Sequence, residues 1–170
     1  MRRFVTLLSV VAVMLLGLGT PWRTPAAAQD ASPVATPAAI PPLLAAWAAA
    51  WTAGDPEQVV AFYTEDAVYT EVPTAIVSEG REEIRDFVTS NYTAFPSIQV
   101  IPHAGFQAEE WAVLEADFAG TSAEGASFSV PFAAVFALEG DKIVRETDYF
   151  DLSSLMSQLQ PSGAAATPAA

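Results

Sequence analysis

The sequence contains no cysteine and a single histidine, His103. The first absence excludes disulfides, thiolate zinc sites, iron–sulfur clusters and a cysteine nucleophile, and the second excludes metal sites built from several histidines. Positive charge is also scarce, because 7 Lys and Arg stand against 20 Asp and Glu, which gives a net charge of −13. Nucleic acids and anionic membrane surfaces bind clustered Lys and Arg, so we expect neither as a partner.

Hydrophobic residues make up 52% of the 170 positions, which is enough for a packed core and too much for a disordered chain. The length fits one domain with additional segments at its ends. Residues 29–40 and 161–170 are rich in Pro, Ala, Ser and Thr and nearly uncharged, so we expect a flexible linker and a disordered tail there. The folded domain is therefore expected over residues 41–160.

Residues 1–28 have the pattern of an export signal peptide. Arg2 and Arg3 precede an apolar run over residues 4–19, and three alanines at residues 26–28 provide small side chains for cleavage. The apolar run is shorter than the roughly 20 residues that cross a bilayer, which disfavours a permanent anchor. We therefore expect a secreted or extracytoplasmic protein, with membrane contact only through an uncleaved signal segment.

Helical patterns dominate the first half of the expected domain. Large apolar residues recur every four positions over residues 43–51, which predicts a helix that ends at Gly54. Asp55, followed by proline, predicts the N-cap of a second helix, whose buried face includes Phe62 and Tyr63.

The rest of the domain alternates between strand and helix signals. A strand is predicted over residues 67–72, then a loop over 73–79 and a third helix from Gly80. A period of two predicts four further strands, over residues 98–106, 110–120, 127–138 and 143–150. A short helix capped at Asp151 or Ser153 follows. Helices followed by strands indicate an α+β fold, in which a curved antiparallel sheet wrapped by helices leaves a cavity between the layers.

Three segments together resemble a known superfamily. They are AAWTAGDPEQVVAFYTEDAVYTEVP at residues 49–73, EGREEIRDFV at residues 79–88 and VPFAAVFALEGDKIVRETDYFDLSSLMSQL at residues 130–159. Their order and spacing resemble the nuclear transport factor 2-like superfamily, specifically its SnoaL-like polyketide-cyclase branch. The resemblance covers essentially all of residues 41–160. It implies a cone-shaped α+β fold with a deep, mostly apolar pocket, and commonly a homodimer formed through the outer face of the sheet.

Aromatic residues are numerous for a domain of this size, so we expect some of them to line the pocket and contact a small apolar molecule. The residues predicted to contact this molecule are Trp47, Trp51, Phe62, Tyr63, Phe87, Trp111, Phe132 and the acidic Glu115. Each aromatic side chain taken alone would also fit a plain core position.

Two carboxylates are the candidates for chemistry. Asp117 lies in the middle of a predicted strand, where aspartate is disfavoured, and Asp148 lies in the last strand. The resemblance to limonene-epoxide hydrolases and SnoaL-like cyclases implies that both face the pocket as general base and general acid, with Tyr69 as the matching tyrosine of the first strand. Two carboxylates in an apolar pocket do not both ionise easily, so one pKa rises and a proton donor stands beside an acceptor. Such a pair needs no cofactor to move a proton.

The alternative is that these residues have structural or solvated roles. Asp117 would face solvent if the strand alternation were shifted by one residue, and Asp148 could hold a backbone amide. The sequence also departs from two relatives. Epoxide hydrolases carry an arginine where this chain has Glu115, and ketosteroid isomerases carry their base where it has Val72. Neither mechanism is therefore expected in identical form.

Three functions remain open from the sequence. The domain is a cofactor-free isomerase, cyclase or hydrolase, a non-catalytic domain that binds an apolar ligand, or a dimerisation module. The lone His103 is expected at the surface rather than in a catalytic triad, because the chain has no G-x-S-x-G motif.

Overall fold

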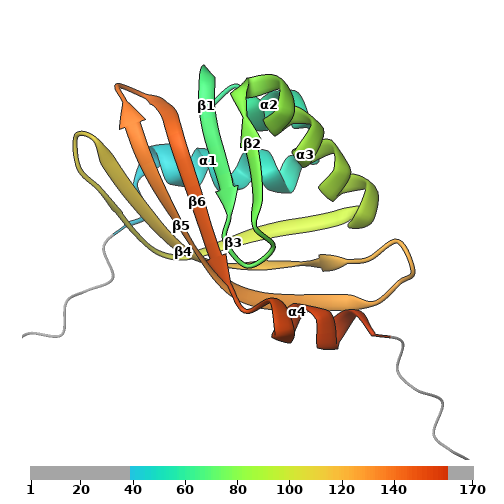
Figure 1. The fold of residues 1–170 in the computed structure, drawn as a ribbon. Helices are drawn as coiled ribbons and strands as arrows, with labels where there is room; N and C mark the ends of the chain where they lie inside the picture. Colours follow the sequence, from blue (N-terminus) through green and yellow to red (C-terminus); the bar gives the residue numbers. More distant parts are fainter. Residues whose placement is uncertain (1–38, 161–170) are drawn as a thin grey trace, which may run out of the picture. The chain divides into compact units, whose positions relative to one another are not determined.

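The computed structural model describes residues 39–160 (Figure 1). The expected signal peptide at residues 1–28, most of the linker at residues 29–40 and the expected tail at residues 161–170 lie outside these described residues.

Two helices open the described chain. α1 spans Pro42–Ala53 and ends at Gly54, whose φ of 75° is the left-handed conformation that glycine adopts without steric cost. α2 spans Pro56–Val60, and the Asp55 carboxylate accepts a hydrogen bond from the backbone N–H of Glu57 at its start. Both helices begin with a proline, as the sequence pattern predicts.

The second helix is shorter than predicted, because Tyr63 is the first residue of a strand and not part of the helix. The reason is a competing backbone contact. The carbonyl of Phe62 accepts a hydrogen bond from the backbone N–H of Ile143, 2.8 Å away, which draws the chain into the sheet directly after α2.

Six strands form one sheet in the order β2-β1-β6-β5-β4-β3. The strands are β1 Tyr63–Glu71, β2 Ile76–Glu79, β3 Ser97–Gln107, β4 Trp111–Thr121, β5 Ser127–Glu139 and β6 Lys142–Phe150. The four strands from β3 to β6 form an antiparallel meander, whereas β1 pairs with β6 in parallel. The sheet is thus mixed, which corrects the prediction of an antiparallel sheet. The β1–β2 turn and the three turns of the meander together reverse the chain four times, so β6 runs in the same direction as β1.

The predicted loop over residues 73–79 contains a further strand. β2 pairs antiparallel with β1, so that Tyr69 lies opposite Ser78 and Glu71 opposite Ile76. The reversal between them is tight, since the backbone N–H of Ala75 donates to the carbonyl of Val72 and Ala75 has a φ of 58°. The hydrogen bonds to β1 stabilise a strand that is too short for its own sequence signal to be recognised.

The remaining helices are α3, Gly80–Ala94, and α4, Leu152–Leu159. α1 packs against β3 and α3 against β1, and Figure 1 shows the strongly curved sheet around them. On β5, every second side chain from Phe128 to Leu138 is buried on this inner face. The described residues therefore form an α+β fold whose helices enclose one face of a curved sheet. None of the helices within residues 39–160 has the length and hydropathy that a membrane span requires.

Candidate functional site

A cavity of about 200 Å³ lies between the inner face of the sheet and the helices. Its wall is mostly apolar and rich in aromatic residues, with contributions from α1, α3, α4, β1, β3, β4, β5 and β6. The aromatic lining residues are Trp47, Trp51, Tyr69, Phe87, Phe95, Phe118, Phe132 and Phe150. Thr74 and Met156 line the cavity and are also exposed, so they mark its opening beside α4 and the β1–β2 turn.

Asp148 is the carboxylate of β6 that borders this cavity. Its Oδ2 accepts a hydrogen bond from the hydroxyl of Tyr69 at 2.9 Å. The two side chains meet because parallel pairing places Tyr69 opposite Glu146 and Glu71 opposite Asp148. Glu71 also lines the cavity, and its Oε1 accepts a hydrogen bond from Thr74 at 2.6 Å.

Glu146 lies two residues before Asp148 on the same face of β6 and is fully buried, with an exposed fraction of 0%. Its Oε2 accepts a hydrogen bond from the hydroxyl of Tyr63, and the Tyr63 oxygen in turn accepts one from the indole Nε1 of Trp47 at 3.2 Å. Residues from α1, β1 and β6 therefore enclose this carboxyl group completely.

The two carboxyl groups are neighbours, because residues two apart on a strand share a face, and each affects the pKa of the other. Burial raises the pKa of Asp148 to about 7, with a further upward contribution from Glu71 that the hydrogen bonds from Tyr69 and Glu146 oppose. Burial, and then repulsion from Asp148, raises the pKa of Glu146 well above its usual range. Near neutral pH the pair therefore holds a proton inside the protein.

The structure brings several predicted residues together at the cavity. Trp47, Trp51, Phe87 and Phe132 line it, as do Tyr69 and Asp148. Phe62 and Tyr63 do not. Phe62 packs against the outside of the core cluster, and the buried Tyr63 holds Glu146 instead of contacting the cavity.

The opposite face of the sheet carries three other predicted residues, so their expected place in the pocket is corrected. On β4, Ala112, Leu114 and Ala116 are buried, whereas Trp111, Glu115 and Asp117 alternate with them and point outward. Trp111 is 45% exposed and lies under the guanidinium of Arg145, 5.2 Å from its ring centroid.

Asp117 in particular does not pair with Asp148. Its carboxylate lies 3.1 Å from Nε2 of His103, and both side chains are partly exposed, at 31% and 47%. Strand alternation is the physical reason, because a shift of one residue moves a side chain to the other face of the sheet.

Glu146 is the site residue that the sequence analysis missed. Its spacing of two from Asp148 was a usable signal, since residues i and i+2 of a strand share a face. The burial of Glu146 could not be read from the sequence, because it depends on Trp47 and Tyr63, which are distant along the chain.

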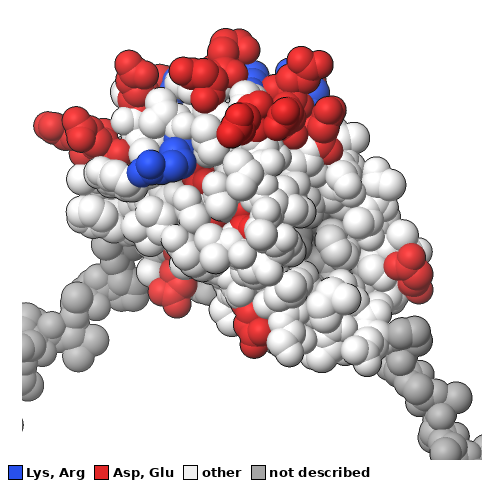
Figure 2. All heavy atoms as spheres, viewed as in Figure 1, with Lys and Arg blue, Asp and Glu red and all other residues white. Residues whose placement is uncertain are grey.

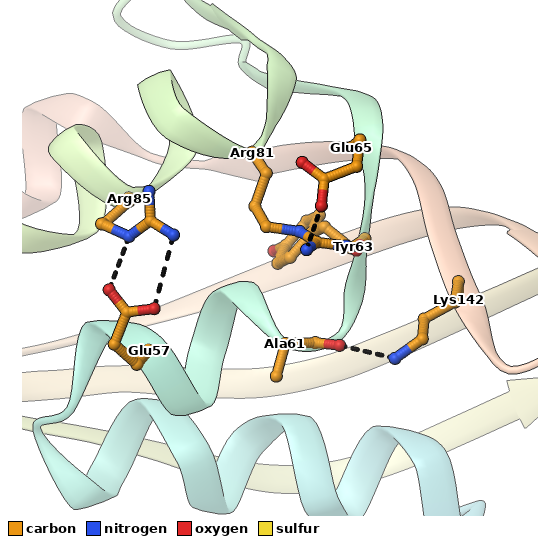
Figure 3. Close-up of polar contacts among 7 residues, drawn as sticks. All are labelled: Glu57, Ala61, Tyr63, Glu65, Arg81, Arg85 and Lys142. Atoms are coloured by element: carbon orange, nitrogen blue, oxygen red, sulfur yellow. Dashed lines mark hydrogen bonds and ion pairs between the residues drawn. The ribbon is translucent and has the colours of Figure 1, made fainter.

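Basic side chains of the described residues lie away from the cavity. Arg81 pairs with Glu65 at 2.5 Å and donates to the backbone carbonyl of Tyr63, while Arg85 pairs with Glu57 at 2.6 Å (Figure 3). Carboxylates gather over α2, α3 and the β1–β2 hairpin, whereas the surface around α4 is mostly uncharged (Figure 2). Within residues 39–160, no group of three or more His, Asp or Glu is arranged to hold a metal ion.

Comparison with known proteins identifies the family. The family model of the SnoaL-like domain matches residues 44–146, which is more than half of the chain. The protein therefore belongs to the SnoaL-like domain family.

Solved structures agree with this assignment. A protein with a ketosteroid isomerase-like fold from Catenulispora acidiphila DSM 44928, solved in complex with trimethylamine, is 28% identical with a TM-score of 0.67, over 71% of this chain and 93% of that one. A polyketide cyclase candidate from Pseudomonas putida KT2440 is 22% identical with a TM-score of 0.63, over 69% of this chain and 96% of that one. The second likeness concerns the fold alone. No curated protein matches the chain.

Proposed function

We propose that this domain binds a small, largely apolar molecule in its cavity and that Asp148 exchanges a proton with it. The observation that carries the proposal is the position of Asp148, which borders an aromatic cavity and has Tyr69 as its hydroxyl donor. A pKa of about 7 supports it, because both protonation states of Asp148 are then populated near neutral pH, as acid–base catalysis requires.

This arrangement suits proton abstraction from a carbon next to a carbonyl group. The C–H bond breaks, Asp148 gains the proton, and the electron pair moves into the enolate. Return of the proton to another carbon gives isomerisation. Attack of the enolate on a second carbonyl forms a carbon–carbon bond and gives cyclisation, and Asp148 then returns its proton to the resulting alkoxide. The indole N–H of Trp51, a lining residue, is buried without a hydrogen-bond partner among the described residues and offers a donor for the carbonyl oxygen.

Two further observations support a small-molecule role. Membership of the SnoaL-like family is consistent with isomerase or cyclase chemistry. The relative from C. acidiphila contains trimethylamine, which is a compact organic molecule. The signal pattern in residues 1–28 leads us to propose that this activity takes place outside the cytoplasm.

Hydrogen–deuterium exchange at a simple ketone tests the proposal. With cyclohexanone in heavy water, followed by proton NMR, the protein should accelerate loss of the α-hydrogen signals. Asp148→Asn should lower the accelerated rate about a hundredfold, since an amide cannot act as base. Asp117→Asn, the matched control on the other face, should leave the rate unchanged. Equal acceleration by the protein and Asp148→Asn would contradict the proposed role of Asp148.

Non-catalytic ligand binding is the second candidate function. It is favoured by the position of Asp117, because the second carboxylate expected from the hydrolase resemblance faces away from the cavity. Saturation-transfer NMR with the same ketone separates the two functions. A binding signal without accelerated exchange would assign the cavity to a carrier, and Trp51→Ala should then weaken the signal.

A further inference from the structure

The Glu146–Asp148 pair has one pattern of hydrogen bonds that needs explanation. Each carboxyl group has one oxygen that accepts a tyrosine hydroxyl, Tyr63 on Glu146 and Tyr69 on Asp148. The other oxygen of each, Oε1 of Glu146 and Oδ1 of Asp148, is buried and has no donor among the described residues. Two ionised carboxylates would leave both oxygens unsatisfied and repelling each other in a low-dielectric interior.

A single proton between these two oxygens removes the difficulty. An ionised carboxylate only accepts hydrogen bonds, whereas a protonated carboxyl group also donates one. With one proton in the pair, the protonated group donates to its neighbour, and both buried oxygens are satisfied. The pair then carries one negative charge instead of two.

We propose that Glu146 carries this proton and donates it to Oδ1 of Asp148, so that Glu146 acts as a positioning residue that keeps Asp148 ionised at the cavity. The direction of the other donors supports this assignment. Trp47 donates to Tyr63, Tyr63 donates to Glu146, and Tyr69 donates to Asp148. Trp47, Tyr63 and Glu146 therefore form one chain of donors, and a proton on Glu146 extends this chain to Oδ1 of Asp148, whose Oδ2 already accepts from Tyr69.

Burial supports the same assignment. Glu146 is fully enclosed, while Asp148 borders the cavity and is partly exposed, so the charge costs less free energy on Asp148. The titratable groups that face the pair come from β1 and are Tyr63, Tyr69 and Glu71. Glu71 adds negative charge on the Asp148 side, which raises the pKa of Asp148.

Infrared spectroscopy of the purified protein in heavy water tests the assignment directly. At a pH of about 9, ordinary carboxyl groups are ionised, so a carboxylic acid C=O stretch must come from a buried protonated group. We expect this band in the unmodified protein and in Asp148→Asn. It should disappear in Glu146→Gln, which keeps the shape and offers an amide donor to Asp148.

Isotope labelling makes the test independent of variant folding. In protein labelled with carboxyl-¹³C glutamate, the band should shift to lower frequency. A band that stays in place, or that survives in Glu146→Gln, would locate the proton on Asp148 and overturn the assignment. The absence of any such band in the unmodified protein would show both groups ionised and would also overturn it.

The positioning role has its own readout, the pKa of Asp148 followed by NMR of carboxyl-¹³C aspartate. Glu146→Leu removes the donor and should raise this pKa, whereas Glu146→Gln should keep it near the value in the unmodified protein. An unchanged pKa in Glu146→Leu would contradict the role. The positioning role of Glu146 rests on the proposed function, whereas the location of the proton on Glu146 does not. Because the spectroscopic tests use no ligand, their outcome is separate from that of the ketone exchange experiment.

Discussion

Asp117 and Asp148 are both aspartates within a strand of the sheet, Asp117 in β4 and Asp148 in β6. In the structure they differ in almost every respect. Asp148 borders the apolar cavity and has a raised pKa, whereas Asp117 lies on the outer face beside His103 with access to solvent. The comparison shows that a carboxylate acquires unusual chemistry from the face of the sheet it occupies, and not from being an acid within a strand.

The largest expected difference between the inner and outer faces of the sheet is in how much an acidic residue contributes to the free energy of unfolding. Glu146→Ala leaves the hydroxyl of Tyr63 and Oδ1 of Asp148 without a partner in a buried space, so it should lower the free energy of unfolding by about 3 kcal/mol. Glu115→Ala, the control on the outer face, should change it by less than about 0.5 kcal/mol. Denaturant unfolding of both variants measures the contrast, and equal losses would remove the distinction between the faces.

The pH dependence of stability should also separate the two aspartates. Burial raises the pKa of Asp148 in the folded state to about 7, so the native state keeps a proton that the unfolded chain releases. Asp148 therefore lowers the free energy of unfolding by about 1 kcal/mol per pH unit as pH rises from about 4 to about 7. The raised pKa of Glu146 adds a second decrease, which continues above a pH of about 7.

Asp148→Asn should remove the contribution of Asp148 to this slope and make the slope between a pH of about 4 and about 7 shallower, whereas Asp117→Asn should leave the slope unchanged. Urea unfolding midpoints at a series of pH values measure both. If the slope is the same in Asp148→Asn as in the unmodified protein, the buried carboxyl of Asp148 does not bind its proton more tightly in the folded state.

Substitutions on the outer face of the sheet should affect the self-association of the protein. Its exposed large apolar residues are Ile101, Phe106, Trp111, Val113 and Tyr149. We propose that this face forms a homodimer, and Trp111→Ala should then weaken dimerisation about tenfold or more, as loss of an aromatic anchor does. Val77→Ala, an exposed residue of β2, is the control. Sedimentation equilibrium measures the constants, and a monomeric unmodified protein would refute the proposal.

The smallest expected effect concerns the ion pair on the outer face. His103→Ala removes the contact with Asp117, but both groups are partly exposed, so the free energy of unfolding should change by less than about 0.5 kcal/mol. Thermal unfolding of His103→Ala and of the unmodified protein measures this difference. A loss above about 1 kcal/mol would indicate that this pair is more enclosed than its exposure suggests.

Much of the fold could be predicted from local signals. The period of large apolar residues and the turn at Gly54 were enough for α1, and alternation was enough for β3 to β6. The parallel pairing of β1 with β6 was not predictable in this way, because it depends on the whole meander between them.

The site was only partly predictable, and β4 shows why. Large apolar residues lie on both of its faces, because Trp111 and Val113 are exposed whereas Leu114 is buried. Alternation along β4 therefore did not indicate which face, and with it Asp117, points toward the helices. On β6 the polar run from Arg145 to Asp148 gave no burial signal for Glu146.

The contact between β1 and β6 has a consequence for how the chain acquires its site. The hydrogen bonds of Tyr69 with Asp148 and of Tyr63 with Glu146 join residues 79 and 83 positions apart. Such distant partners meet late, because a long loop must close before they come together. A growing or truncated chain that ends before Lys142 would have neither acid in place. The chain would therefore have a carboxyl group able to exchange protons at the cavity only after β6 has formed.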